Sequence, residues 1–162
     1  MTNQPLINPD VASQSLVAGD QSIRPQPVIE VTFDRPGRCY EPGGQLTATS
    51  RVLCPGVVLR ALEQSVVWYT EGKGEEDLMV HRFERVTDRR LLATCPVETA
   101  FTTTLPASPL SYEGVIVKIR WCVRIRAFFQ GARDFVSEHV FQVGSVPPAR
   151  PHRPPPRTEP TP

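Results

Sequence analysis

The alternation of hydrophobic and polar residues between Val115 and Ala127 is the longest regular pattern in the chain. Every odd-numbered position is apolar, whereas the even-numbered positions carry four basic residues, Lys118, Arg120, Arg124 and Arg126. Successive side chains of a strand point to opposite faces of a sheet, so this pattern predicts a strand with one face in the core and one in solvent. A slip of one residue would bury the cations, and we therefore expect a fixed register.

Shorter stretches with strand-like patterns lie on both sides of this one, and turn residues separate them. In the stretch 57–70, "LRALEQ" would also fit a short helical turn, but Leu62, Val66 and Trp68 share one parity and "VVWYT" favours a strand. Residues 91–105 are predicted to form one strand that is interrupted near Pro96. The remaining predicted strands are residues 28–33, 45–53, 78–86 and 132–144.

The number and spacing of these strands indicate the fold class. Short strands bounded by turns, with no strong helix, predict an all-β protein, an antiparallel immunoglobulin-like β-sandwich of about seven or eight strands. The sandwich domain is expected over residues 27–146, a usual size for this fold.

Both ends of the chain differ from this middle part. Residues 1–26 are polar and turn-rich and predict a flexible N-terminal arm. Residues 147–162 hold 8 of the 18 prolines and predict an extended, disordered tail. This proline-rich tail is either an unstructured end or a ligand for an aromatic-lined groove, and its interleaved basic residues are Arg150, Arg153 and Arg157.

Charge and cysteine content narrow the classes of partner. The net charge is +1, and the basic strand lacks interleaved exposed aromatic residues, so no nucleic acid partner is expected. The chain has no transmembrane run and no secretory signal pattern, which favours a cytoplasmic protein. In that compartment, Cys39, Cys54, Cys95 and Cys122 are expected to be free thiols, since no C-x-x-C motif is present.

The basic row, defined as Lys118, Arg120, Arg124 and Arg126, allows two interpretations. Between Gly114 and Arg133 there are five basic residues and no acidic one. Neighbouring strands can neutralise the row through cross-strand ion pairs. Alternatively, the row forms a binding surface for acidic or phosphorylated segments of a protein, or for anionic lipid. The acidic residues available for cross-strand pairing are Glu63, Glu84, Glu98 and Glu138.

The sequence indicates no catalytic, metal or cofactor site. The acidic loop at 71–77 does not have the spacing of an EF-hand. The histidines lie in no motif with a Ser or Cys nucleophile, although a spatial pair of Cys122 with His81 or His139 stays open. We therefore predict that the chain is not an enzyme.

Two segments resemble the arrestin-like family. "CYEPGGQLTATSRV" is similar to that family's early Tyr-x-x-Gly turn and the long strand after it. "FTTTLPASPLSYEGVIVKIRWCVRIRAFF" resembles its Leu-Pro loop, its Ser-aromatic-Glu-Gly turn and the alternating strand that follows. The matching residues are Tyr40, Pro42, Gly43, Leu105, Pro106, Pro109, Ser111, Tyr112, Glu113 and Gly114.

The resemblance implies a non-enzymatic β-sandwich that works as an adaptor or scaffold for protein partners. The chain departs from the pattern because it has room for one sandwich, and because Ala48 stands where the family often has Gly. It would thus be a single-domain, bacterial-type or otherwise divergent member, which pairs with itself or a second subunit to rebuild a double sandwich. The alternative is a structural subunit of a larger complex whose outer sheet face is covered, favoured if Trp68 points outward.

Overall fold

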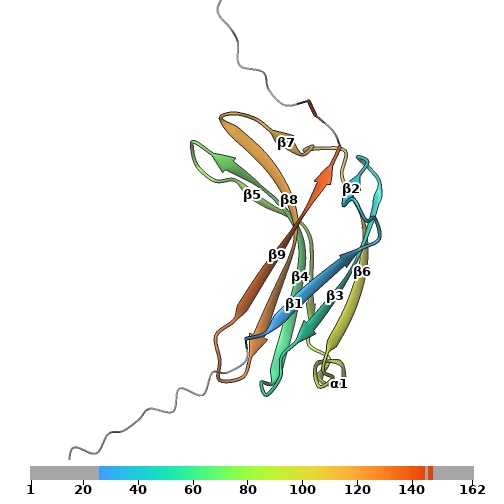
Figure 1. The fold of residues 1–162 in the computed structure, drawn as a ribbon, viewed down its shortest axis with the longest axis vertical. Coiled ribbons are helices and arrows are strands. Elements are labelled where there is room, and N and C mark those ends of the chain that lie inside the picture. The colour runs from blue at the N-terminus through green and yellow to red at the C-terminus, as the bar shows by residue number, and fades with distance from the viewer. Residues whose placement is uncertain (1–25, 145, 148–162) are drawn as a thin grey trace, which may run out of the picture.

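We analysed a computed structural model that describes residues 26–144 and 146–147 (Figure 1). Apart from Gln26 and Pro147, the predicted arm and tail lie outside the described residues, and so do Arg150, Arg153 and Arg157. The predicted bounds of arm, domain and tail therefore stay a prediction. Within the described part, no helix is long and apolar enough to cross a membrane.

The described chain folds into two packed sheets, which confirms the predicted all-β sandwich (Figure 1). One sheet has three strands in the order β1-β3-β6, and the other has six, in the order β2-β9-β8-β4-β5 with β7 paired to β8. All pairs are antiparallel except β2 with β9. The strands are β1 Val28–Phe33, β2 Cys39–Tyr40, β3 Gln45–Leu53, β4 Leu59–Gly72, β5 Leu78–Val86, β6 Val97–Thr104, β7 Tyr112–Glu113, β8 Val117–Phe129 and β9 Phe135–Val143.

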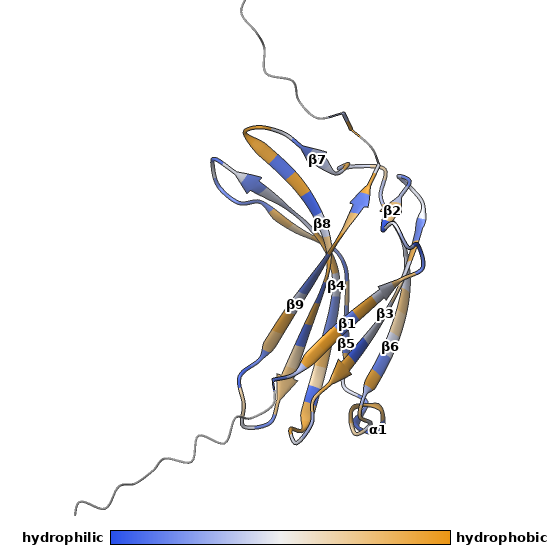
Figure 2. Cartoon of the chain, in the orientation of Figure 1, coloured by the Kyte–Doolittle hydropathy of each residue, from blue (hydrophilic) through white to orange (hydrophobic). Residues whose placement is uncertain are grey.

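The core lies between the two sheets and takes alternate residues from each strand. Along β8, hydrophobic and hydrophilic segments alternate (Figure 2). Trp121, Val123 and Ile125 of this strand are fully buried, as the alternation predicts. Burial of an aliphatic side chain of this size contributes about 1.5–3 kcal/mol, so this face fixes the register of β8.

A polar group sits inside this apolar core. Gln64 of β4 is 1% exposed and shares the inward parity of Leu62, Val66 and Trp68. Its Nε2 donates to the hydroxyls of Ser50 on β3, at 3.0 Å, and of Thr99 on β6. Those two hydroxyls also bond each other at 2.7 Å. The three side chains join the two sheets and satisfy one another, as buried polar groups must.

One local prediction is confirmed, and a second needs correction. The stretch around "LRALEQ" is strand, part of β4, as predicted. The predicted strand over 91–105 begins only at Val97, because a short helix, α1 (Arg89–Leu92), precedes it. The Asp88 carboxylate caps this helix by accepting from the Arg90 amide at 2.9 Å. Such N-caps compensate for the missing hydrogen bonds of a first helical turn.

The predicted core face of β8 is wrong at its beginning. Val115 and Ile116 precede the strand and are 76% and 69% exposed, and Val117 is 39% exposed. The ends of β5 and β8 bend away from the three-stranded sheet (Figure 1). An alternating pattern identifies the two faces of a strand, but burial also requires a second layer over that face.

Candidate functional site

The outer face of the six-stranded sheet, the face away from the three-stranded sheet, carries an apolar row. The strand register aligns Val80 of β5, Val67 of β4, Cys122 of β8 and Val140 of β9. Val67 and Cys122 are at most 1% exposed, although they point away from the core. The row ends at Val80 and Val140, which are 49% and 45% exposed. This apolar row continues across four strands of a face that would otherwise meet water.

A shallow groove of about 370 Å³ adjoins the apolar row. Its two sides carry Phe83 of β5 and Val136 of β9, which are 56% and 48% exposed. In an unbroken strand, Phe83 would share a face with Met79 and His81. The structure places it outward because β5 has a bulge, where Val66 pairs with Arg82 and Val67 pairs with Val80. The other groove residues are Glu63, Ser65, Val67, Val80, Arg124, Arg126 and Glu138.

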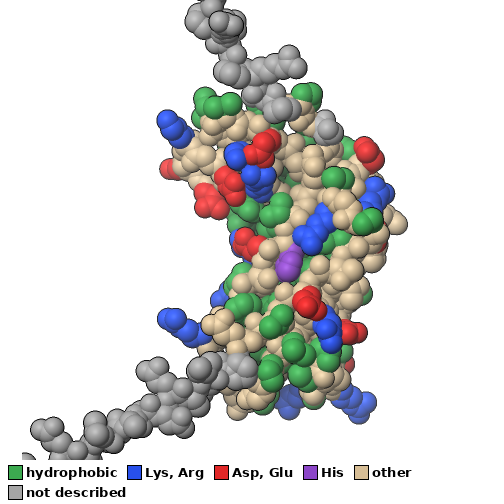
Figure 3. Space-filling view, viewed as in Figure 1, with side chains coloured by type: hydrophobic (Ala, Val, Ile, Leu, Met, Phe, Trp, Pro, Cys, Tyr) green, Lys and Arg blue, Asp and Glu red, His purple; other side chains and the backbone are tan. Residues whose placement is uncertain are grey.

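The basic row lies on the same outer face, as predicted, and each of its members is ion-paired. Arg124 contacts Glu138 at 2.7 Å, and Arg126 contacts Asp134 at 2.8 Å. In the upper part of the sheet, the carboxylate of Glu113 contacts Lys118 at 2.6 Å and Arg120 at 2.7 Å, and Glu71 adds a 3.2 Å contact to Arg120. Side chains of both signs lie next to one another near β7 and β8 (Figure 3).

The partners of the basic row differ in part from the expected ones. Glu138 was among the four expected carboxylates, whereas Glu63, Glu84 and Glu98 pair with Arg85, Arg82 and Arg51 instead. In the isolated chain, the basic row is thus neutralised by ion pairs within the chain, as the first interpretation predicted. The partner-binding role of Lys118, Arg120, Arg124 and Arg126 stays a prediction.

These ion pairs are partly exposed to solvent. The basic side chains are 29–47% exposed in their pairs. Ion pairs at such positions contribute about 0–1 kcal/mol to stability. The hydrogen bond from Lys118 holds the pKa of Glu113 below its usual value, so this carboxylate is ionised near neutral pH.

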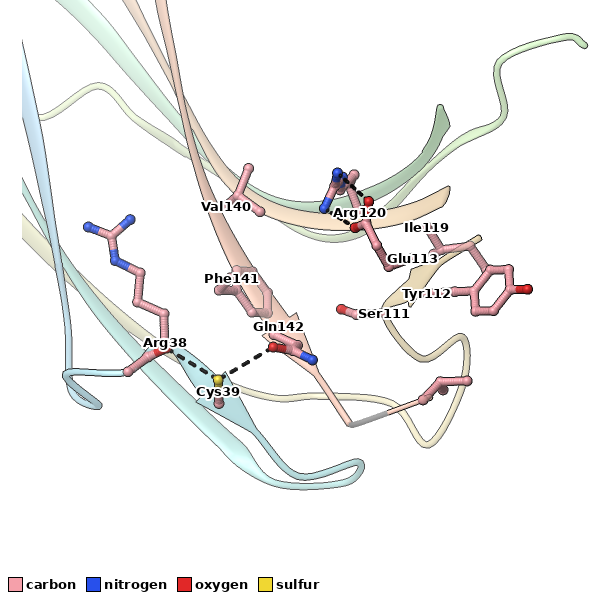
Figure 4. Close-up of a pocket in the computed structure, with 12 residues that line it drawn as sticks. Arg38, Cys39, Ser111, Tyr112, Glu113, Ile119, Arg120, Val140, Phe141 and Gln142 are labelled. Carbon is pink, nitrogen blue, oxygen red and sulfur yellow. Dashed lines mark hydrogen bonds and ion pairs between the residues drawn. The ribbon is translucent and has the colours of Figure 1, made fainter. Parts of the chain in front are cut away.

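A second cleft, of about 450 Å³, lies between β7 and β9, and residues of both faces of the six-stranded sheet line it (Figure 4). It forms where the neighbour of β8 changes: β9 pairs with β8 as far as Trp121, and β7 pairs with Ile119 and Lys118. Ser111 links the two neighbours, because its Oγ accepts from the Val143 amide at 2.9 Å. The side chains in this cleft include Arg38, Cys39, Tyr112, Arg120 and Gln142.

The Ser-aromatic-Glu-Gly segment that resembles arrestins forms one side of this cleft. Tyr112 and Glu113 form β7, and Gly114 follows where the chain turns toward β8. A Cβ at Gly114 would stand 2.4 Å from the Val117 carbonyl oxygen, so a larger residue would displace backbone. Trp121 Nε1 donates to the Pro109 carbonyl at 3.0 Å and ties this loop to β8. The turn residues of the motif thus have a steric role.

The structure separates the candidate Cys–His pairs. Cys122 points to the outer face, and its burial raises the pKa of its thiol to about 12. His81 points to the inner side, where its Nε2 lies 2.8 Å from the Thr104 carbonyl. His139 pairs with the inward Val123 and bonds the Ser137 hydroxyl at 2.9 Å. Opposite faces of one sheet therefore hold the thiol and the imidazoles. Among the described residues, no group of three or more acidic, His or Cys side chains is placed to bind a metal.

Sequence reasoning missed the apolar row. Trp68, which was to decide between an open and a covered face, points inward and packs against the core. The exposed apolar surface comes from the opposite parity, through Val67 and Cys122. One signal was present in the sequence: two adjacent valines, Val66 and Val67, cannot both face the core of a regular strand.

Comparison with known proteins supports the fold. No protein-family model matches the chain, and no curated protein matches it in sequence. Among solved structures, it is similar to Spo0M, a sporulation control protein from Bacillus subtilis, with a TM-score of 0.52 and 18% identity over 74% of this chain and 50% of Spo0M. The chain thus spans about half the length of Spo0M. At this identity the likeness shows the fold, an all-β sandwich.

The prediction that the chain is not an enzyme is corrected by a second match. The superoxide reductase (neelaredoxin) from Ignicoccus hospitalis is similar over 73% of this chain and 80% of its own, with 13% identity and a TM-score of 0.45. A single-substitution variant of that reductase matches with 11% identity over 70% and 79% of the two chains and a TM-score of 0.43. An enzyme is thus among the similar structures, so a sandwich fold does not by itself exclude enzymatic activity. These scores carry no activity over to this chain.

Proposed function

We propose that this chain is an arrestin-like domain that acts as an adaptor or scaffold and binds a protein partner on the outer face of its six-stranded sheet. The observation that carries the proposal is the apolar row with its adjoining groove. Val80, Phe83, Val136 and Val140 expose apolar surface together, on two strands of one face. Exposed apolar surface on both sides of a groove can mark an interaction site on a protein that is otherwise polar outside.

The proposed partner segment carries both apolar and acidic groups. Its apolar side chains would fill the groove between Phe83 and Val136. Its carboxylates or phosphates would replace the internal partners of Lys118, Arg120, Arg124 and Arg126. Arginine presents a fork of donors that suits such groups, and three of the four residues in the basic row are arginines. The exposed, weak ion pairs of the free chain support this exchange.

Other features agree with this proposal. The segment that resembles arrestins forms β7 and the loop that β8 holds through Trp121. The four cysteines are free, which supports a cytoplasmic location. The tail residues Arg150, Arg153 and Arg157 remain a separate candidate contact, which removal of residues 147–162 would test.

The same apolar row also favours a second function, that of a structural subunit whose outer face is permanently covered. Val67 and Cys122 are closed to water already, and covering Val80 and Val140 would complete a second core on this side. A permanent subunit copurifies in fixed proportion and does not exchange, whereas an adaptor exchanges its partner in competition with added free domain.

Site-specific photo-crosslinking in the source cells tests the proposed surface. A photoreactive residue at Val136 should capture a defined partner. The same residue at Thr32, exposed on the outer face of the three-stranded sheet, should not. Capture at Val136 should fall at least about tenfold when Lys118, Arg120, Arg124 and Arg126 are all changed to Glu, because each like charge adds repulsion.

Two results would count against this proposal. Equal capture at Val136 and Thr32 would show that the outer face has no special role. Full capture by the charge-reversed variant would remove the basic row from the interface and leave the apolar row alone. Arg51→Glu, on the other sheet, is the matched control for a change of charge in an exposed strand.

A further inference from the structure

We propose that the open edge of β5 pairs antiparallel with β5 of a second copy of this chain, with Phe83 on the two-fold axis. The result is a dimer in which the two six-stranded sheets continue into one another. Phe83 lies both at this edge and beside the groove of the proposed binding surface. The inference does not rest on the proposed function, because the edge of β5 is open whether or not a partner binds in the groove.

The edge of β5 is open in the described structure. β5 is the last strand of its sheet, and β4 is its only strand neighbour among the described residues. In the same part of the chain, β5 makes no backbone hydrogen bond outside its ladder with β4. Its exposed apolar residues are Leu78, Met79, Val80 and Phe83. An exposed strand edge presents unpaired amide and carbonyl groups, which a further strand can satisfy.

The sequence of β5 complements itself in one register. When Phe83 lies opposite the partner's Phe83, Arg82 lies opposite the partner's Glu84, and Glu84 lies opposite the partner's Arg82. The aromatic rings meet on the outer face, and the opposite charges meet on the inner side. A register centred on Arg82 or on Glu84 would instead place like charges in direct opposition. Directly opposite side chains are the closest contacts in an antiparallel pair, so this difference favours the register centred on Phe83 over those two.

An unsatisfied donor points to the same register. Within the part of the chain that the structure describes, Arg82 Nη1 is the one buried side-chain nitrogen or oxygen without a hydrogen-bond partner. The other terminal nitrogen of Arg82 contacts Glu84 at 2.6 Å, and the guanidinium lies 4.5 Å from the centre of the Phe101 ring. A buried donor of this kind calls for an acceptor. In the proposed dimer the carboxylate of the partner's Glu84 stands opposite Arg82, and a rotation of the guanidinium away from the atoms that cover it would let Nη1 donate to that carboxylate.

The edges of the three-stranded sheet lack these features. β1 and β6 direct mainly polar residues outward, among them Glu30, Thr32, Glu98 and Thr102. The dimer would also place two copies of the outer face side by side, related by the two-fold axis. A partner with two binding segments would then gain from the high effective concentration of the second site.

Light scattering coupled to size exclusion tests the dimer on the full chain. The wild type should have the mass of two 18.1 kDa chains at about 100 μM and dissociate on dilution. Phe83→Lys should be a monomer at the same concentration, because it sets like charges against each other on the axis. Thr49→Lys, an equal change on the exposed face of β3, should remain a dimer. A wild type that stays monomeric at about 100 μM, or a dimer that survives Phe83→Lys, overturns the proposal.

Disulfide trapping tests the register even if a charged variant folds poorly. In a Cys39→Ser, Cys95→Ser background, which removes both exposed thiols, Phe83→Cys should crosslink two chains on mild oxidation. Arg85→Cys should not, since the two copies of that position would lie about 13 Å apart along the strands, beyond disulfide reach. Equal crosslinking at both positions, or none at Phe83→Cys, contradicts the register.

A charge swap gives an independent check. Arg82→Glu alone and Glu84→Arg alone should each abolish the dimer, and the double variant should restore it. Loss of the dimer in all three variants, with folding retained by circular dichroism, would contradict the pairing. These outcomes are separate from capture at Val136, so the dimer and the proposed function can fail independently.

Discussion

The two outer faces of the sandwich are built from strands of similar alternation and yet differ in what they offer to water. On the three-stranded sheet, Arg51 stands between Glu30 and Glu98 and contacts both at 3.4 Å. Beside them, the hydroxyls of Thr47 and Thr102 bond each other at 3.0 Å. Apart from Val28 and Leu53 at one end, small polar side chains and balanced charges cover this face where it meets solvent. This face is therefore largely polar and can meet water without a further layer over it.

The outer face of the six-stranded sheet is different because apolar residues follow both parities of its strands. Val66 faces the core and Val67 faces outward, and each is at most 1% exposed. Trp121 and Cys122 repeat this arrangement on β8, where both are fully buried. A sheet with two apolar sides is usual where both sides are covered. The difference between the two faces therefore supports our proposal that the outer face of the six-stranded sheet binds a partner.

The largest change in stability is expected when a charge is placed at the centre of the apolar row. Cys122→Asp should lower the free energy of unfolding by about 3–5 kcal/mol, because the site would bury an uncompensated carboxylate. Thr49→Asp, at an exposed position of β3, should change it by less than about 0.5 kcal/mol. Urea denaturation of both variants measures the difference. Similar values would show that Cys122 is an ordinary surface position.

Part of this difference could be predicted from the sequence, and the reasons for the rest are physical. The alternation along β8 identified Lys118, Arg120, Arg124 and Arg126 as outward residues, and all four are on the outer face. The bulge that turns Phe83 outward could not be recognised from the alternation of β5. A bulge is an extra residue relative to the opposite strand, so it is defined only once the two strands are paired.

The candidate site depended on contacts between strands that a single sequence does not reveal. Glu71, Glu113 and Asp134 neutralise the basic row, and each lies on or beside a strand whose register was unknown. The apolar row requires the alignment of four strands, so no single segment contains it. The face that a residue occupies could thus be predicted within a single strand, whereas its contacts with other strands could not.

A second prediction concerns the buried hydrogen bonds of Gln64, which join the two sheets. Gln64→Leu should lower the free energy of unfolding by about 1–3 kcal/mol, because Ser50 and Thr99 lose the buried donor that both accept from. Gln45→Leu is the control at an exposed position of β3 and should have little effect. A stabilised Gln64→Leu variant would mean that hydrophobic packing outweighs this network.

A third prediction uses pH. Burial, together with the nearby Arg38 charge, lowers the pKa of His139 below its usual value of 6.5. The unfolded chain therefore takes up a proton first as the pH falls, and stability is lost below about pH 6.5. His139→Gln should lose less stability than the wild type between pH 7 and pH 5, as measured by urea denaturation at each pH. Identical pH dependence in the two proteins would exclude His139 as the source.

The smallest change in stability is expected for a double variant that tests whether the exposed valines of the outer face serve binding and not folding. The double variant Val136→Thr, Val140→Thr keeps the shape and strand preference of both residues, which are 48% and 45% exposed. Its free energy of unfolding should change by no more than about 0.5 kcal/mol per site. Capture of a partner by a photoreactive residue at Arg85, which flanks the same face, should nevertheless fall, since each hydroxyl must be desolvated in an apolar contact.

The reverse change on the other sheet completes this test. Thr32→Val, Thr49→Val makes the outer face of the three-stranded sheet more apolar and should likewise leave stability within about 0.5 kcal/mol per site. It should not alter partner capture. If the two double variants behave alike in both measurements, exposed valines on this molecule are incidental. If only Val136→Thr, Val140→Thr loses the partner while both remain equally stable, the apolar surface serves contact and not the fold.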